Sequence, residues 1–277
     1  MLEIKNLRVA FPTRTGLVEA VRGVSLEVGR EKLGIVGESG SGKSTVGRAV
    51  LDLLPPSARV TADRLAFEGI DLLHASKAQW RELRGGRIGM VLQDPKYSLN
   101  PVMRVGAQIA ESLRDHQGYH GRKAKARVLE LLRDVRIRDP ERVARAYPHE
   151  LSGGMGQRVM IAMMLAGEPD LLIADEPTSA LDVTVQLQVL AILDDLVSRR
   201  GMGLVFISHD LELVATFCNR VAIMYAGRIV ELCRAQELHA AQHPYTRGLL
   251  GCLPRLDRPV PRLPVLVRDP AWLEAEA

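Results

Sequence analysis

Residues 37–45 constrain this chain more than any other stretch, because they read Gly-Glu-Ser-Gly-Ser-Gly-Lys-Ser-Thr. An apolar run at 33–36 precedes them, and a predicted helix at 46–54 follows. This is the pattern G-x-x-x-x-G-K-[ST] between a strand and a helix, the context in which it binds phosphate. The glycines let successive backbone N–H groups turn toward one anion, and the helix N-terminus adds a partial positive charge. The sequence therefore predicts binding of a nucleoside triphosphate.

Two side chains of this loop have separate predicted tasks. Lys43 is placed to reach the β- and γ-phosphates, and the Ser44 hydroxyl is placed to bind Mg²⁺. The other loop residues offer backbone N–H groups and are candidate nucleotide contacts: Gly37, Glu38, Ser39, Gly40, Ser41, Gly42 and Thr45.

Composition and charge narrow the class of protein. The 277 residues are 47% hydrophobic and 25% charged, which suits one large domain or a domain with a sizeable insertion. The net charge of +4 is dispersed along the chain, which favours a solvated surface over a nucleic-acid or anionic-membrane surface. The three cysteines form no C-x-x-C pair and are expected to be free thiols, with a metal site as the alternative. Without a signal peptide or an apolar run of ~18 residues, we expect a cytoplasmic chain that reaches a membrane only through a partner.

The apolar periodicity divides the chain into β-rich and helical parts. Strands are predicted at 2–11 and 17–28, with further β-structure at 60–71, a short helix at 80–84 and a buried strand at 88–92. Helical spacing replaces strand signals over 94–166, and strands return at 171–174, 204–207, 221–224 and 228–231, with a helix at 183–199. This order predicts an α/β core with an inserted helical subdomain. The tail after His243 carries six prolines and is predicted to be extended and loosely packed.

Four side chains stand where predicted strands end. Asp175 and Glu176 follow a buried strand, so the first can bind Mg²⁺ and the second can orient an attacking water, unless they only terminate the strand. His209 follows the next strand and is interpreted as a phosphate sensor, with a purely structural histidine as the alternative. Phe11 ends the first strand and either fills the core or stacks on a base.

A second glycine motif, LSGGMGQ at 151–157, precedes an apolar helical run. Ser152 with Gly153 and Gly154 at a helix start makes a second anion site. One chain rarely needs two phosphate cradles for one nucleotide. We therefore predict that two chains pack head to tail and that the second anion site of each chain binds the ATP held by the other.

Taken together, these motifs resemble the ATP-binding subunits of ABC transporters over about residues 2–250. The Walker A loop is at 37–45, the Q-loop glutamine is Gln93, and the signature is at 151–157. Walker B is LLIAD at 171–175 followed by Glu176, the D-loop is SALD at 179–182, and His209 matches the switch histidine. Phe11 matches the adenine-stacking aromatic residue.

The resemblance implies the fold and the role of each residue. The implied fold is a RecA-like α/β P-loop NTPase core with an N-terminal antiparallel β subdomain and an inserted α-helical subdomain. ATP and Mg²⁺ are the implied ligands, with Ser44, Gln93 and Asp175 around the metal and Glu176, His209 and Gln93 in hydrolysis. The residues implied to meet the nucleotide of the opposite subunit are Ser152, Gly153, Gly154, Gln157 and Asp182.

Four longer segments resemble the oligopeptide, dipeptide and nickel import branch of this family. They are QDPKYSLNP at 93–101, YPHELSGGM at 147–155, ADEPTSALDVTVQ at 174–186 and HPYTRGLL at 243–250. Gly156 departs from the branch, which usually has a larger polar residue there, and the tail lacks the cysteine-bearing segment of many longer members. The branch implies an ATPase that powers uptake of peptides or of nickel and metal-chelate solutes.

The implied partners follow from that activity. They are integral membrane permease subunits, a second identical or related ATPase subunit and, indirectly, an extracytoplasmic solute-binding protein, with no nucleic acid. The chain is then peripheral at the cytoplasmic face of the cell membrane. Residues 97–103, just after Gln93, are the predicted coupling surface, with Tyr97 and Leu99 as contact residues, and a loop that only packs locally is the alternative. Trp272 and Leu273 are predicted to dock on the core.

The predicted domains are an ABC ATPase domain at 1–250, with its helical subdomain at about 94–166, and a proline-rich extension at 251–277. One alternative is a soluble ABC ATPase of DNA repair or translation, which usually needs long coiled-coil insertions or tandem ATPase halves. Another is a P-loop phosphotransferase or GTPase, which has no use for LSGGMGQ. The chain shows neither long coiled-coil insertions nor tandem ATPase halves, which disfavours the first alternative, and the presence of LSGGMGQ disfavours the second.

Overall fold

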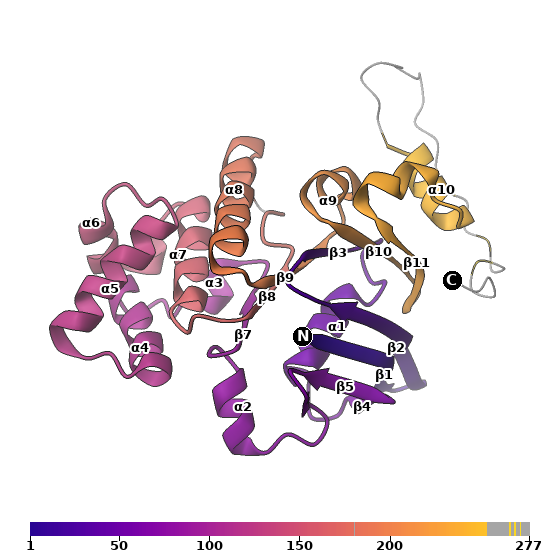
Figure 1. Cartoon of the computed structure of the whole chain (residues 1–277), viewed down its shortest axis with the longest axis horizontal. Coiled ribbons are helices and arrows are strands. Elements are labelled where there is room, and N and C mark those ends of the chain that lie inside the picture. Colours follow the sequence, from indigo (N-terminus) through magenta and orange to yellow (C-terminus); the bar gives the residue numbers. More distant parts are fainter. Residues whose placement is uncertain (180, 254–265, 267–268, 270–271, 273–277) are drawn as a thin grey trace. The chain divides into compact units, whose positions relative to one another are not determined.

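The computed structural model describes residues 1–179, 181–253, 266, 269 and 272. The chain divides into two compact units, the first formed by Met1–Leu73 and Phe206–Ala277 and the second by His74–Val205. Figure 1 labels the elements of both. None of the described helices is long and apolar enough to cross a membrane.

The first unit begins with an antiparallel sheet. Its long strands β1 (Leu2–Thr13) and β2 (Gly16–Val28) pair from Leu2↔Val28 to Thr13↔Gly16 and bury alternate apolar side chains. The sheet continues through β5 (Arg64–Phe67) and β6 (Ile70–Asp71), and β4 (Arg59–Thr61) pairs with β1. The strands predicted at 2–11 and 17–28 are confirmed.

The same unit contains the parallel pair that carries the glycine loop. Strand β3 (Lys32–Val36) runs parallel to β10 (Arg220–Tyr225), which forms an antiparallel hairpin with β11 (Arg228–Arg234). Helix α9 (Leu211–Phe217) packs closely on β3, because a Cβ at Gly34 would lie 2.1 Å from Val214 Cγ1. The unit is completed by α1 (Lys43–Val50), the 3₁₀ helix η2 (Ala235–Ala240) and α10 (Pro244–Gly251).

Two predictions about the first unit need correction. The helix after the glycine loop runs over Lys43–Val50 rather than 46–54, because Gly42 in the left-handed region ends the loop directly before the lysine. The tail after His243 was predicted to be extended, yet α10 occupies Pro244–Gly251. Pro244 stands in the first turn of α10, where the missing N–H of proline needs no helical partner. The expected contacts of Leu273 lie outside the described residues.

The second unit combines a short parallel sheet with a group of helices. Strand β7 (Ile88–Val91) pairs in parallel with β8 (Leu171–Asp175), and both strands are fully buried. Between them lie α3 (Pro95–Ser98), α4 (Val105–Gln117), α5 (Gly121–Asp134), α6 (Pro140–Arg145), η1 (Pro148–Glu150) and α7 (Gly153–Leu165). Helix α2 (Lys77–Leu83) precedes β7. Helix α8 (Val183–Arg200) follows β8, and the chain passes back to the first unit within β9 (Gly203–Ser208).

The helical periodicity predicted for this unit is confirmed by α5. Its buried positions are Ala124, Val128, Leu131 and Leu132, and Val135 directly after the helix is also buried. Helices α4 and α5 contact each other, and both contact α6 and α7, so the four helices form one group (Figure 1). Burying these side chains stabilises the helices far more than their individual propensities do.

Candidate nucleotide-binding site

The glycine loop at 37–45 connects β3 to α1 in the first unit, and two of its glycines are required by close approaches. Gly42 has φ +101°, and a Cβ there would lie 2.5 Å from the carbonyl oxygen of Ala20. A Cβ at Gly37 would lie 2.0 Å from the carbonyl oxygen of Met224. Any larger residue would push the loop off β2 and β10. The loop is therefore held against these two strands, and Ser39 and Gly40 on it are exposed.

Lys43 lies inside the curve of this loop. Its side chain is only 4% exposed, and Nζ donates to the carbonyl oxygens of Gly37 at 2.8 Å and Glu38 at 2.9 Å. A buried ammonium needs such acceptors, because an unpaired one would lose its hydration without compensation. The loop thus holds a buried positive charge at the carbonyl oxygens of its first two residues.

The Ser41 hydroxyl supplies a second test of the fit to phosphate. Ser41 is 5% exposed, and within the described part of the chain its Oγ is a buried oxygen without a hydrogen-bond partner. Buried polar atoms are rarely left unsatisfied, so an unpaired hydroxyl in a glycine loop indicates a ligand position. With the N-terminus of α1 and Lys43, this donor set fits a triphosphate. Ser44 and Thr45 follow in the first turn of α1, half-buried.

Phe11 and His209, two further predicted site residues, also belong to the first unit. Phe11 is half-buried near the end of β1 and pairs in register with the exposed Val18. His209 is exposed directly after β9. Its neighbour Asp210 caps α9 by accepting a hydrogen bond from the Leu213 N–H at 2.9 Å, which fixes the turn that presents the histidine.

The second unit carries the acidic pair at the end of β8. Asp175 is 3% exposed, and Glu176 is half-buried with φ +47°, a left-handed backbone that non-glycine residues adopt only under constraint. Gln93 Nε2 donates to Glu176 Oε2 at 3.2 Å and to Ser179 Oγ at 3.2 Å. The structure thus brings the predicted Gln93 and Glu176 together.

Ser179 was not among the predicted site residues, although its D-loop segment was identified. Its hydroxyl also donates to the Glu176 carbonyl oxygen at 3.2 Å, so one side chain links the glutamate to the segment that follows. A serine three residues after a strand-ending glutamate was the only sequence signal for this contact.

The glycine motif at 151–157 begins helix α7. Ser152 is the N-cap, and its Oγ accepts a hydrogen bond from the Met155 N–H at 3.4 Å. Ser152 and Gly153 are exposed at this helix start. Asp182 caps the neighbouring α8 by accepting from the Val185 N–H at 3.0 Å. The two helix starts meet at Gly154, where a Cβ would lie 2.4 Å from Val185 Cγ1.

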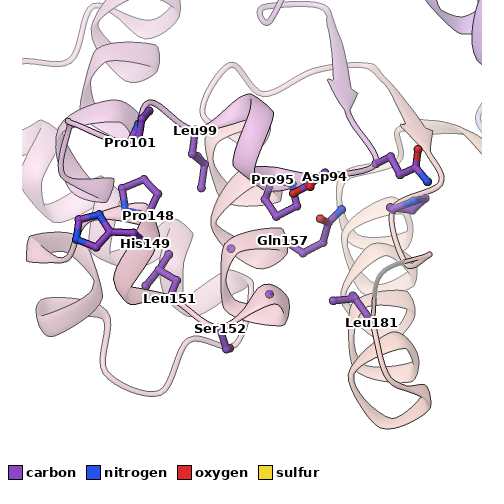
Figure 2. A pocket seen from close by; sticks show the side chains of 14 residues that line it. Asp94, Pro95, Leu99, Pro101, Pro148, His149, Leu151, Ser152, Gln157 and Leu181 are labelled. Carbon is purple, nitrogen blue, oxygen red and sulfur yellow. The ribbon is translucent and has the colours of Figure 1, made fainter.

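A pocket of about 500 Å³ lies beside this helix start in the second unit, as Figure 2 shows. Gln157 on α7 lines it, is 1% exposed, and has an Nε2 without a hydrogen-bond partner in the described part of the chain. Gly156 allows Pro95 to pack close to helix α7, because a Cβ at Gly156 would lie 3.3 Å from the Pro95 Cγ. The full lining comprises Gln93, Asp94, Pro95, Leu99, Pro101, Pro148, His149, Leu151, Ser152, Gly153, Gly156, Gln157, Pro177 and Leu181.

The cysteines lie apart from these groups. Burial raises the pKa of the Cys218 thiol to about 12 and also raises the pKa of Cys233, to which nearby carboxylates contribute. Cys252 is half-buried after α10. Among the described residues, no three potential metal-ligating side chains of the His, Cys, Asp and Glu types form a group.

Two features define the class of protein as a P-loop nucleoside triphosphatase. The first is a glycine loop with a buried lysine between a strand and a helix. The second is an Asp-Glu pair at the end of a buried strand. Residues 21–179 match the family described as "ABC transporter". The chain belongs to this family, as an ATP-binding subunit with ATPase activity, and the resemblance identified from the motifs is confirmed.

Relatives cover nearly the whole chain. It is 48% identical over 260 residues to "Oligopeptide transport ATP-binding protein OppD" of Bacillus subtilis (strain 168), spanning 93% of this chain and 73% of that protein. It is 47% identical over 266 residues to "Dipeptide transport ATP-binding protein DppD" of Lactococcus lactis subsp. cremoris (strain MG1363), with coverage of 95% and 76%.

Solved structures agree on the fold. The structure described as "Dimeric structure of a post-hydrolysis state of the ATP-binding cassette MJ0796 bound to ADP and Pi" superposes with a TM-score of 0.76 at 27% identity. The match covers 85% of this chain and 99% of that one. A second, cbiO1 from Clostridium perfringens, gives a TM-score of 0.71 at 26% identity, with coverage of 86% and 91%. The predicted ABC ATPase fold is confirmed.

Proposed function

We propose that this chain hydrolyses ATP to drive peptide import through membrane permease subunits, peripherally at the cytoplasmic face of the membrane. The observation that carries the proposal is the phosphate loop with Lys43 held at the carbonyl oxygens of its first two residues, in a chain whose relatives are named for oligopeptide and dipeptide transport. The nickel and metal-chelate solutes of the same branch are the second substrate class, and the relatives' names favour peptides. An extracytoplasmic solute-binding protein delivers the solute and contacts this chain only indirectly.

We assign each task in hydrolysis to residues that the sequence motifs identified. Lys43 binds the β- and γ-phosphates, and Ser44, Gln93 and Asp175 are the Mg²⁺ ligands, a set of oxygen donors that suits this ion. Bound Mg²⁺ supplies charge neutralisation for the phosphates.

Glu176 orients the attacking water and accepts its proton, supported by its hydrogen bond with Gln93. His209 contacts the γ-phosphate, and Phe11 stacks on the adenine. The remaining loop residues, Gly37 to Thr45, line the nucleotide with N–H groups and hydroxyls, except that the Glu38 N–H donates to the Tyr245 hydroxyl.

A second ATPase subunit completes each site in this proposal. Ser152, Gly153 and Gly154 form an exposed helix start with no acidic residue in its first turn, which suits the phosphates of another chain's ATP. Gln157 and Asp182 belong to the same surface. The partner is an identical or a related chain packed head to tail, and no nucleic acid takes part.

The coupling surface in this proposal is the loop at 97–103, which follows Gln93 in the chain. The Gln108 side chain fixes the conformation of this loop through hydrogen bonds. Its Nε2 donates to the carbonyl oxygens of Asn100 and Met103, and its Oε1 accepts from the Asn100 N–H. Val102 is 79% exposed on it, whereas Leu99 is 4% exposed. The expectation that Leu99 is a surface contact is therefore wrong, and Val102 takes its place. The Tyr97 side chain lies outside the described part of the chain.

We retain the predicted domain organisation in this proposal. Residues 1–250 form the ABC ATPase domain, residues at about 94–166 form its helical subdomain, and 251–277 form a proline-rich extension.

Reconstitution tests the proposed function. The chain is co-expressed with candidate permease subunits of a peptide importer, and the complex is reconstituted in lipid vesicles with a solute-binding protein. We expect ATP hydrolysis to be stimulated by an oligopeptide mixture and peptide to accumulate in proportion to ATP consumed. Stimulation by a nickel chelate but not by peptides would redirect the substrate class. A chain that never co-purifies with membrane subunits would contradict import altogether.

A further inference from the structure

Residues 243–246, His-Pro-Tyr-Thr, fix the direction of one buried tyrosine. His243 is the N-cap of α10, and its Nδ1 accepts a hydrogen bond from the Tyr245 N–H at 3.2 Å. Pro244 follows in the first turn with a preset backbone angle. Tyr245 is consequently held at the start of the helix with 0% of its side chain exposed.

The Tyr245 hydroxyl reaches the phosphate loop, 207 positions away in the sequence. The Glu38 N–H donates to this hydroxyl at 3.3 Å. The carbonyl oxygen of the same Glu38 accepts from Lys43 Nζ at 2.9 Å. The peptide unit that carries the Glu38 N–H also carries the Gly37 carbonyl oxygen, which accepts from Lys43 Nζ at 2.8 Å, so it connects the tyrosine hydroxyl to the lysine ammonium.

The hairpin between β10 and β11 supports the loop at a second point. The Gly227 N–H donates to the Ser41 carbonyl oxygen at 3.0 Å, and the Met224 carbonyl oxygen closes the space behind Gly37. Tyr225 lies in this hairpin, and its ring centroid is 4.3 Å from that of Tyr245. The two supports of the loop are thus packed on each other, and Figure 1 shows α10 beside the hairpin.

Trp272 completes an aromatic cluster that we define as Tyr225, Tyr245 and Trp272. Its ring centroid lies 6.0 Å from Tyr225 and 5.9 Å from Tyr245, distances at which aromatic rings attract each other beyond their burial. Leu266 lies over Gly248 of α10, where a Cβ would be 2.2 Å from the leucine Cδ1. The described C-terminal residues thus cover α10 and the tyrosine. This bears out the expectation that Trp272 docks on the core.

We propose that Tyr245 is a positioning residue for ATP, which orients the peptide between Gly37 and Glu38 in the phosphate loop, and that Trp272 holds the tyrosine in place. The inference rests on ATP binding at this loop. Without the hydroxyl, the peptide between Gly37 and Glu38 loses the partner of its N–H, and the Gly37 carbonyl oxygen of the same peptide is held less firmly where it accepts from Lys43 Nζ. The tyrosine acts through the loop and does not touch the nucleotide.

Tyr245→Phe separates positioning from packing, because it keeps the ring and removes the oxygen. We expect the Kd and KM for Mg·ATP to rise roughly fivefold, the scale of one lost hydrogen bond, with kcat within about twofold. Tyr225→Phe is the matched control, since it removes a hydroxyl from the same aromatic cluster and keeps its ring contacts. We expect it to bind Mg·ATP as the unaltered chain does. Equal Kd values for the two variants would overturn the inference.

Lys43→Ala distinguishes this failure from a failure of the proposed function. If Lys43→Ala binds Mg·ATP normally, the phosphate loop is not the nucleotide site and both proposals fall. If Lys43→Ala loses binding while Tyr245→Phe keeps it, only the positioning role falls.

A measurement on the folded chain covers the case in which Tyr245→Phe does not fold. The chain has two tryptophans, and Trp80→Phe leaves Trp272 as the sole reporter. We expect Mg·ATP to change the Trp272 emission as Tyr245 and the peptide between Gly37 and Glu38 adjust. Emission that is unchanged at saturating Mg·ATP would contradict the connection between the loop and the aromatic cluster.

Discussion

Replacing Gly154 by alanine is expected to strain the contact between α7 and α8 at their first turns. The new Cβ would lie 2.4 Å from Val185 Cγ1, a separation that real Cβ atoms do not show. Val185 has little freedom to move, because its β-branched side chain is stiff and its N–H is bonded to the Asp182 carboxylate at 3.0 Å. Overpacking of this kind costs about 1–3 kcal/mol.

The adjacent glycine supplies a matched control. A Cβ at Gly153 would meet only Leu181 Cδ2, at 3.8 Å, so Gly153→Ala adds ordinary contact. It should be neutral, or stabilising by up to ~1 kcal/mol through the better helix propensity of alanine. In a Val185→Ala background the nearest remaining Val185 atom to the Gly154 methyl is Cβ, at 3.6 Å, and the clash disappears. The Gly154–Val185 pair should therefore show a coupling of about 1–3 kcal/mol.

Hydrogen exchange of the amides in α7 and α8 measures these free energies locally, without assuming that the two units unfold together. Gly154→Ala should lower the opening free energy of both helix starts, and Val185→Ala should suppress that effect. The reasoning fails if Gly154→Ala and Gly153→Ala agree within about 0.5 kcal/mol, or if the cycle shows no coupling.

Three further predictions concern coupling, dimerisation and thiol chemistry. Val102→Asp should lower peptide uptake by at least ~10-fold in the full complex, because an unpaired carboxylate would be buried against the permease. The equally polar change Leu232→Asp is the control and should leave uptake unchanged. Normal uptake by Val102→Asp would remove this loop from the coupling surface. Ser152→Arg should stop hydrolysis while leaving Mg·ATP binding to the monomer intact, whereas Lys43→Ala should weaken Mg·ATP binding itself. If titration calorimetry shows that both variants lose Mg·ATP affinity equally, the site is not shared between two chains. At pH 8 the Cys218 thiol, whose pKa is about 12, should react with iodoacetamide ~10³-fold more slowly than a thiol of ordinary pKa 9.0. The reason is that the reactive thiolate form is far rarer when the pKa is raised. Rapid labelling of Cys218 in the folded chain would contradict its burial.

Local patterns in the sequence were sufficient for most elements of the fold. Alternating apolar residues predicted β1 and β2, and helical spacing predicted α5 with its buried Leu131 and Leu132. These patterns are reliable because each reflects one buried face of one element. The assignment of α10 failed for a related reason: counting prolines ignores that Pro244 occupies the one part of a helix where proline is favoured.

The site was predictable where its residues belong to contiguous motifs. The glycine loop, the Asp175–Glu176 pair and the signature segment each carry their chemistry within a few positions. Contacts between distant segments were not predictable, because nothing local encodes them. The Tyr245 hydroxyl on Glu38 and the Gln93 amide on Glu176 depend on how strands and helices pack, and one sequence without packing information does not specify that. The roles of the individual site residues in hydrolysis stay predictions.

Surface exposure was the other quantity that the sequence did not supply. Leu99 and Val102 are both apolar residues of the loop after Gln93, yet the first is buried and the second is 79% exposed. The difference arises from the hydrogen bonds of Gln108, which turn the backbone between them. A substitution chosen from the sequence alone would have tested folding rather than coupling.

The turnover of Glu176→Gln tests the central claim most directly. The change keeps the shape of the side chain beside Gln93 and removes the carboxylate that orients water. The account predicts that the variant binds Mg·ATP with unchanged affinity, accumulates as an ATP-bound dimer, and hydrolyses ATP at least ~100-fold more slowly than the unaltered chain. Steady-state hydrolysis near the rate of the unaltered chain would contradict it.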